Sequence, residues 1–141
     1  MADEKKLLIP VDGSENSLRA LSYVIKRAAT DKRLKIYVLN VQPALPHSLF
    51  VTRDMIASHH EVKSRESLVR GRRVLAKTHL AAEVVVRVGA PAEEIVNFAG
   101  RKHCGEIVIG TRGLGSVRGL LLGSITTKVL HSTRVPVTAV P

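Results

Sequence analysis

Short apolar stretches alternate along the chain with longer segments whose apolar residues recur every three or four positions. The short stretches are rich in Val, Ile and Leu, so they are predicted to be strands. They lie at residues 5–11, 34–41, 84–88, 106–109 and 135–140. Helices are predicted between them, at residues 14–30 with Ser14 as N-cap, 53–79, 90 to at least 99, and 124–131.

Strands and helices therefore alternate strictly from one end of the chain to the other. This order is typical of parallel strands that are joined by right-handed crossover helices. The length of 141 residues corresponds to one domain. We predict an α/β fold for residues 1–141, with a single doubly wound, five-stranded parallel sheet and helices on both faces.

The longest predicted helix, at residues 53–79, has polar residues over most of its surface. Its apolar side is expected from Val62, Val69 and Ala76 at heptad spacing, with Leu68 and Leu75 beside them. The connection before it, residues 43–52, is longer than most and is interpreted as either mobile or functional.

The composition indicates a globular domain in a reducing compartment. Hydrophobic residues make up 45% of the chain and charged residues 24%, which argues against a disordered or fibrous chain. The longest nearly uncharged stretch, residues 38–51, contains two prolines and is too short to cross a bilayer. Cys104 is the only cysteine, so no internal disulfide can form. We expect a cytoplasmic protein without a membrane span.

Basic residues outnumber acidic ones, with 22 Lys and Arg against 12 Asp and Glu and a net charge of +10. Much of the excess lies between Arg53 and Lys77, where a solvated helix face is the simpler interpretation. Four aromatic residues offer little surface for base stacking. Nucleic acid is therefore disfavoured as a partner, and a basic dimer that binds it nonspecifically is kept as an alternative.

A glycine-dense segment separates the fourth predicted strand from the last predicted helix. Its glycines and the residue that opens the helix are Gly110, Gly113, Gly115, Gly119, Gly123 and Ser124. Glycines allow positive φ angles and close approach to the main chain, and the first N–H groups of a helix attract anions. The segment is predicted to bind phosphate. No lysine precedes Ser124, so the segment is not a P-loop, and it has no G-x-G-x-x-G either.

Side chains in and after the segment add candidate phosphate ligands. Arg112 and Arg118 could donate charge-assisted hydrogen bonds, although a solvated position is the alternative for each. Ser124 and Thr126 supply hydroxyl groups.

Three loops are predicted to meet at one end of the sheet. Asp12 follows the first predicted strand, Val41 ends the second and Gly110 follows the fourth. Ligands of doubly wound sheets bind at the carboxyl ends of the strands, where the strand order reverses. The alternative for Asp12 is an acid that stabilises the turn at Gly13-Ser14.

The spacing Gly110-x-x-Gly113, nine residues, then Gly123-Ser124 resembles the G-2x-G-9x-G-[ST] signature of the ATP-binding branch of the universal stress protein family. Thr111 stands where that family often has serine. The resemblance extends over nearly the whole chain. It also includes the segments Ile9-Pro-Val-Asp-Gly-Ser14, Val88-Gly-Ala-Pro-Ala-Glu-Glu-Ile95 and Val135-Pro-Val137.

The resemblance implies a Rossmann-like sheet of strand order 3-2-1-4-5 with a nucleotide across the first and fourth strands. It places Asp12 near the adenine and ribose, the Val41 backbone at the adenine edge, and the glycine segment at the ribose and phosphates. The nucleotide-binding residues that it implies are Pro10, Val11, Asp12, Val41, Gly110, Thr111, Arg112, Gly113, Gly123, Ser124, Ile125 and Thr126. It also implies a homodimer through the closing strand, Val135–Val140, whose apolar edge favours pairing.

The resemblance implies an ATP-binding protein that regulates a stress response, and the residues predict at most slow hydrolysis. AMP or ADP is the alternative ligand, and Mg or Mn could bridge the phosphates with few protein ligands. No residue is identified as a catalytic base, and the six histidines lack metal-ligand spacing. A protein partner is expected without being identified.

An ATPase or nucleotidyl-transfer enzyme of related fold is the second hypothesis. Enzymes of that class resemble S-G-G-x-D-S after the first strand. This chain has Val11-Asp-Gly-Ser-Glu-Asn-Ser17 there and lacks the paired glycines.

Overall fold

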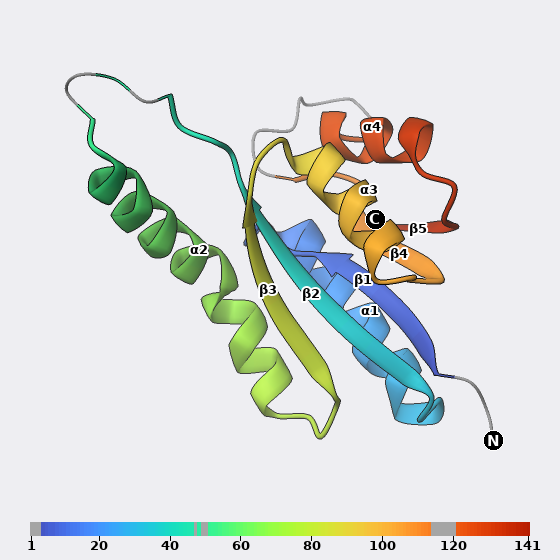
Figure 1. The fold of residues 1–141 in the computed structure, drawn as a ribbon. Coiled ribbons are helices and arrows are strands. Elements are labelled where there is room, and N and C mark those ends of the chain that lie inside the picture. The colour runs from blue at the N-terminus through green and yellow to red at the C-terminus, as the bar shows by residue number, and fades with distance from the viewer. Residues whose placement is uncertain (1–3, 47, 49–50, 114–120) are drawn as a thin grey trace.

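Five parallel strands form one twisted sheet in the computed structural model, which describes residues 4–46, 48, 51–113 and 121–141 (Figure 1). The sheet order is β3-β2-β1-β4-β5. The strands are β1 (Lys5–Pro10), β2 (Leu34–Gln42), β3 (Ala82–Val88), β4 (Glu106–Gly110) and β5 (Val137–Val140). Every neighbouring pair is parallel. The predicted fold class and strand order are both confirmed.

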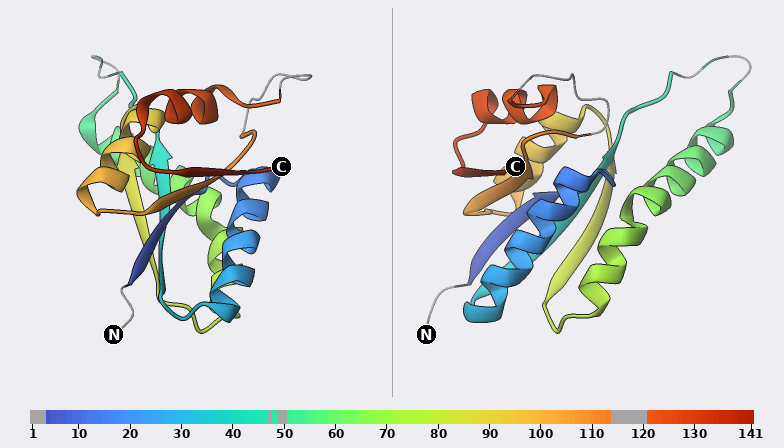
Figure 2. Two further views of the ribbon diagram at one scale, coloured as in Figure 1. Left: turned by 90° about the vertical axis from the view of Figure 1, so that its right-hand side faces the viewer. Right: turned by 180° about the vertical axis from the view of Figure 1, so that it is seen from behind.

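Four helices cover the two faces of this sheet, as the edge-on view in Figure 2 shows. They are α1 (Glu15–Thr30), α2 (Arg53–Ala76), α3 (Pro91–Arg101) and α4 (Ser124–Ser132). Helices α1 and α2 pack on one face, and α3 and α4 pack on the other. This arrangement follows from right-handed crossovers on either side of β1, because the chain moves towards β3 first and towards β5 afterwards.

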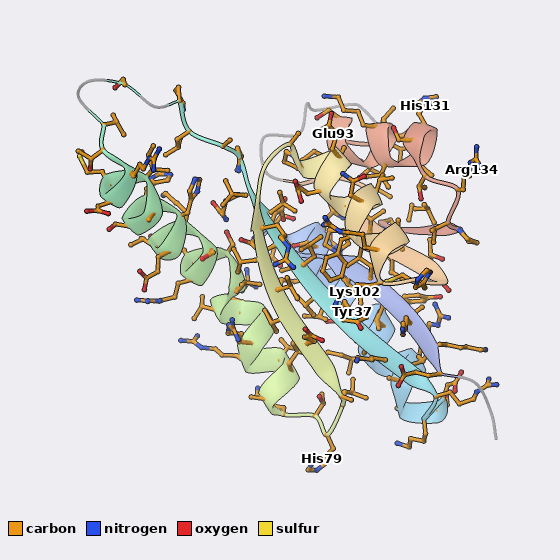
Figure 3. All side chains as sticks on the ribbon, in the orientation of Figure 1. Tyr37, His79, Glu93, Lys102, His131 and Arg134 are labelled. Atoms are coloured by element: carbon orange, nitrogen blue, oxygen red, sulfur yellow. The ribbon has the colours of Figure 1, made fainter. Side chains whose placement is uncertain are left out.

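Each face has its own apolar core, because successive strand residues point to opposite faces. Leu21 and Ile36 belong to the core under α1 and α2. Tyr37, labelled in Figure 3, and Phe98 belong to the core under α3 and α4. Their rings meet edge to face with centroids 5.4 Å apart. Cys104 is buried in the same core, and burial raises the pKa of its thiol.

Side-chain caps fix where α1 and α2 begin. The Ser14 hydroxyl accepts a hydrogen bond from the Ser17 N–H at 3.2 Å, which confirms the predicted N-cap. Thr52 accepts one from the Met55 N–H at 3.1 Å. Among the helices of the described residues, none is long and apolar enough to cross a membrane.

The buried face of α2 differs from the predicted one, and the helix ends at Ala76 instead of residue 79. Val62 and Val69 are 51% and 42% exposed, so the prediction that they form its apolar side was wrong. The buried residues are His60, Ser64, Leu68 and Gly71, spaced three or four positions apart. Gly71 packs over Leu21 and Val11, where a Cβ would make ordinary contacts at 3.5 Å to Leu21 Cδ2 and 3.8 Å to Val11 Cγ1.

The closing strand is shorter than predicted, beginning at Val137 and not at Val135. Pro136 has no N–H to give to a ladder, and the Val135 N–H donates to Thr133 Oγ1 at 3.0 Å. The strand lies at one edge of the sheet, next to β4.

Candidate functional site

A cavity of about 330 Å³ opens at the carboxyl ends of β1, β2 and β4, where the strand order reverses. Its size lies at the lower end of the range for small-molecule sites. Its walls come from the three strand ends, from α2, from the first turns of α3 and α4, and from the segment after β4. The predicted residues that line it are Pro10, Val11, Asp12, Val41, Gly110, Arg112, Gly113, Gly123, Ser124, Ile125 and Thr126.

Thr111 is the predicted site residue that does not line the cavity. Its N–H donates to the Val140 carbonyl at 2.9 Å, and its carbonyl accepts from the Gly123 N–H at 2.6 Å. Thr111 therefore joins β5 to the start of α4. Arg118, Gly115 and Gly119 lie outside the described residues.

Asp12 connects the turn after β1 with the segment after β4. Its Oδ1 accepts a hydrogen bond from the Ser14 N–H at 2.9 Å, as expected of an acid that stabilises this turn. Its Oδ2 lies against Gly113, only 2.6 Å from where a Cβ on that glycine would stand. The same carboxylate thus holds the turn and faces the cavity.

Among the described glycines of the segment, Gly110 and Gly113 leave little space for a Cβ. Gly110, Gly113 and Gly123 have no positive φ, so at these three positions the expectation of positive φ was wrong. A Cβ on Gly110 would lie 2.9 Å from the backbone of Asn16, because α1 begins directly against the end of β4. Gly13, in the turn after β1, does have a left-handed conformation, with φ at 88°.

The N-terminus of α4 faces the cavity without a side-chain cap. Gly123 is its N-cap residue and makes no side-chain hydrogen bond. Ser124 and Ile125, in the first turn, line the cavity and are exposed, so this end of the helix, whose first N–H groups have no partner within the helix, faces the cavity. The buried Thr126 hydroxyl donates to the Gly110 carbonyl at 2.9 Å and so fastens α4 to the end of β4.

The opposite part of the cavity combines apolar walls with a free strand end. Leu39, Pro91 and Ile95 line it together with Val41. Strand β1 pairs with β2 only as far as Pro10 opposite Leu39, so Val41 extends beyond the end of β1. The backbone of Val41 can therefore meet a ligand edge on that side.

Sequence reasoning missed two buried amide side chains that also line the cavity. Gln42 donates from Nε2 to Asn40 Oδ1 at 2.7 Å, and Asn40 donates from Nδ2 to the Val11 carbonyl, also at 2.7 Å. Both residues are buried and line the cavity. The available signal was the appearance of two amides at the end of an otherwise apolar strand.

Two further residues, Lys63 and Ser67 of α2, had no signal in the sequence. They line the cavity because α2 packs tightly on the turn after β1. A Cβ on Gly13 would lie 3.2 Å from Ser67 Cα. Lys63 pairs with Glu66 at 3.4 Å on the exposed surface, a contact that contributes little to stability.

The charges on the described walls suit an anionic ligand. Lys63 and Arg112 are positive and Asp12 is negative, and the uncapped end of α4 adds partial positive charge. Within the described ranges, no group of three or more His, Cys, Asp or Glu side chains could hold a metal ion. In Figure 3, His79 lies at the turn between α2 and β3 and His131 lies on α4, far apart.

Comparison with known proteins gives consistent matches. The model of the universal stress protein family matches residues 4–141. Universal stress protein MJ0531 of Methanocaldococcus jannaschii is 31% identical over 138 residues, which cover 96% of this chain and 81% of that protein.

Solved structures match over the full length of the sheet. MJ0577 of the same organism has a TM-score of 0.73 at 26% identity, covering 99% of this chain and 96% of that one. The universal stress protein from Archaeoglobus fulgidus in complex with dAMP has a TM-score of 0.69 at 22% identity, covering all of both chains. A family protein from Arabidopsis thaliana with AMP bound has a TM-score of 0.69 at 22% identity, covering 96% and 90%. At 22% identity, the Archaeoglobus fulgidus and Arabidopsis thaliana structures show that this chain has the same fold.

Proposed function

The chain belongs to the universal stress protein family, and from this premise we propose that it binds an adenine nucleotide, ATP before AMP or ADP, in the cavity at the carboxyl ends of β1, β2 and β4. The observation that carries the proposal is the meeting of Asp12, Val41 and the glycine segment in that one cavity. The AMP and dAMP complexes of structures with the same fold support it.

The two ends of the cavity suit the two ends of such a ligand. The base would lie against the apolar wall of Leu39, Ile95 and Val41, with its edge at the Val41 backbone. The phosphates would lie at the N-terminus of α4, where Ser124 and the first N–H groups are accessible. Arg112 lies beside that helix start, since a Cβ on Gly123 would stand 3.4 Å from Arg112 Cα, and it could add positive charge there. Mg or Mn would need few protein ligands beyond the phosphates.

We place this binding in a regulatory role in the stress response, with hydrolysis slow or absent. Among the described lining residues, Asp12 is the acid, and its Oδ1 already accepts from the Ser14 N–H. Fast hydrolysis would need a base that accepts a proton from the attacking water. Asp12 is instead used to hold the turn after β1, so we expect it to be a poor base. We expect a bound nucleotide to change the conformation of the segment after β4 and thereby the surface that a protein partner would contact. A cytoplasmic location fits a chain with a single, buried cysteine.

Calorimetric titration of the purified protein with ATP, ADP, AMP and GTP tests the proposal. Saturable binding of the adenine nucleotides at micromolar to millimolar concentration is expected, with GTP weaker. If no adenine nucleotide binds in that range, the proposal is wrong. Phosphate release that saturates with ATP at enzyme-like rates would favour the ATPase hypothesis instead.

A further inference from the structure

The amide chain formed by Gln42 and Asn40 has a fixed direction. The Val11 carbonyl can only accept a hydrogen bond, so Asn40 must turn its NH₂ group towards it. The oxygen of Asn40 then faces Gln42, which must in turn donate from Nε2. One backbone carbonyl therefore determines which end of the Gln42 amide points away from the chain of bonds.

The end that points away is the carbonyl oxygen, Oε1. This atom has no hydrogen-bond partner in the part of the chain that the structure describes. Gln42 is 7% exposed and lines the cavity, so it is a buried polar side chain with an open acceptor beside the ligand space. Oε1 is not among the fully buried side-chain atoms that lack a partner, so it is reached from the cavity and can accept a hydrogen bond from a ligand there.

We propose that Gln42 reads the 6-amino group of the adenine base and thereby selects adenine over purines with a 6-oxo group. The inference rests on the proposed nucleotide binding, which brings the edge of the base to the neighbouring Val41 backbone. An amino group at position 6 donates to Oε1. A carbonyl there, as in guanine or hypoxanthine, sets two acceptors against each other and leaves both unpaired.

Asn40 acts in this scheme as a positioning residue. It is fully buried and holds the Gln42 amide in one orientation. Without that restraint the Gln42 amide could rotate by half a turn and offer its NH₂ group to a 6-oxo purine. Selectivity therefore depends on the whole chain of bonds from the Val11 carbonyl to Oε1.

Titration with three triphosphates that differ at position 6 tests the proposal, and the Gln42 variant separates its effect from that of N1, which carries a hydrogen only in the 6-oxo base. These are ATP with an amino group, inosine triphosphate with an oxo group and purine riboside triphosphate with hydrogen. The wild-type protein is expected to bind ATP about tenfold or more tightly than inosine triphosphate, with the purine compound between them. Gln42→Met, which removes the acceptor and keeps the volume, is expected to bring the three affinities within about threefold of one another.

Asn97→Met is the matched control, because it removes an exposed amide of α3 that does not line the cavity. It is expected to leave the wild-type order of affinities unchanged. Far-ultraviolet circular dichroism and thermal melting show whether each variant is folded. If Gln42→Met does not fold, the wild-type series still decides, since equal affinity for ATP and inosine triphosphate overturns the proposal.

The outcomes separate this inference from the proposed function. A wild-type protein that binds none of the three ligands removes both. A protein that binds ATP and inosine triphosphate equally well binds nucleotide without reading position 6 through Gln42. A Gln42→Met variant that is folded and keeps a tenfold preference for ATP assigns the selectivity to another group, and the inference is then wrong.

Discussion

At the scale of single residues, two glycines of the same motif have different structural reasons to be glycine. A Cβ on Gly110 would meet the main chain of Asn16 at 2.9 Å, and main chain cannot rotate out of the way. A Cβ on Gly113 would meet the Asp12 carboxylate at 2.6 Å, which is the end of a side chain. Substitution at the first position should therefore disturb packing, and substitution at the second should displace a ligand-facing group.

We expect Gly113→Ala to weaken ATP binding about tenfold while the melting temperature changes little, because Asp12 must swing away from the cavity. Gly110→Ala is expected both to weaken ATP binding and to lower the free energy of unfolding by about 1–3 kcal/mol, because α1 must shift to make space for the Cβ. Calorimetry and thermal melting measure the two effects separately.

Gly100→Ala is the control for both variants, since a Cβ on Gly100 has no neighbour within 4 Å. It should bind ATP like the wild type and melt at the same or a slightly higher temperature. Unchanged ATP affinity in a folded Gly113→Ala variant would show that the position of Asp12 does not matter for binding.

At the scale of elements, an ion pair links α1 to the two strands on the far side of β1. Arg27 of α1 donates from both terminal nitrogens to Glu106 of β4, at 2.7 and 3.2 Å, and Thr138 of β5 donates to the same carboxylate at 2.8 Å. Burial alone would raise the pKa of Glu106, but the hydrogen bonds from Arg27 and Thr138 and the charge of Arg27 outweigh it and lower the pKa. The pair therefore stabilises the folded state when Glu106 is ionised.

Glu106→Gln is expected to lower the free energy of unfolding at neutral pH by about 1 kcal/mol, a value that allows for partial exposure. Because the folded pKa lies below the unfolded one, the stabilisation is complete above the unfolded value of about 4.3. It is lost as the pH falls through the lower folded pKa. Urea unfolding at several pH values should show the two proteins converging in acid.

The matched control is Glu93→Gln, an exposed acid on α3 (Figure 3). It is expected to change the free energy of unfolding by less than about 0.5 kcal/mol. A difference between wild type and Glu106→Gln that stays constant down to the most acidic pH would contradict the assigned role of the carboxylate.

At the scale of the whole molecule, β5 lies at an edge of the sheet, and within the described residues β4 is the one strand that pairs with it. The Pro136 carbonyl accepts from Ile107 of β4 and the Val140 carbonyl from Thr111 just after β4, so by the alternation along a strand the N–H groups of Val137 and Ala139 point outward. Such an edge favours pairing with a second copy of the chain. We propose a homodimer through this strand, in agreement with the expectation from the sequence.

Ala139→Pro tests that homodimer, because proline at an outward-facing edge position removes an N–H without breaking the bonds to β4. The wild-type protein is expected to sediment as a dimer at tens of micromolar, and the variant is expected to sediment as a monomer with a similar melting temperature. A wild-type protein that sediments as a monomer would contradict the proposal. A folded variant that stays dimeric would place the interface elsewhere.

The sequence alone determined the number, order and type of the elements, because local periodicity and capping residues such as Ser14 predict each strand and helix. It also led to the glycine segment, Asp12 and Val41, since each stands directly after a predicted strand and parallel strands end at the same edge of the sheet. These are local or topological properties.

Only the tertiary structure decided which faces pack and which distant side chains complete the cavity. The apolar spacing on α2 favoured Val62 and Val69, yet the helix buries His60, Ser64, Leu68 and Gly71, because the face that packs is set by how the helix docks on α1 and the sheet. The same packing brings Lys63 to the cavity. The direction of the Gln42 amide likewise depends on a carbonyl thirty-one positions earlier in the chain, a contact that no local pattern in the sequence records.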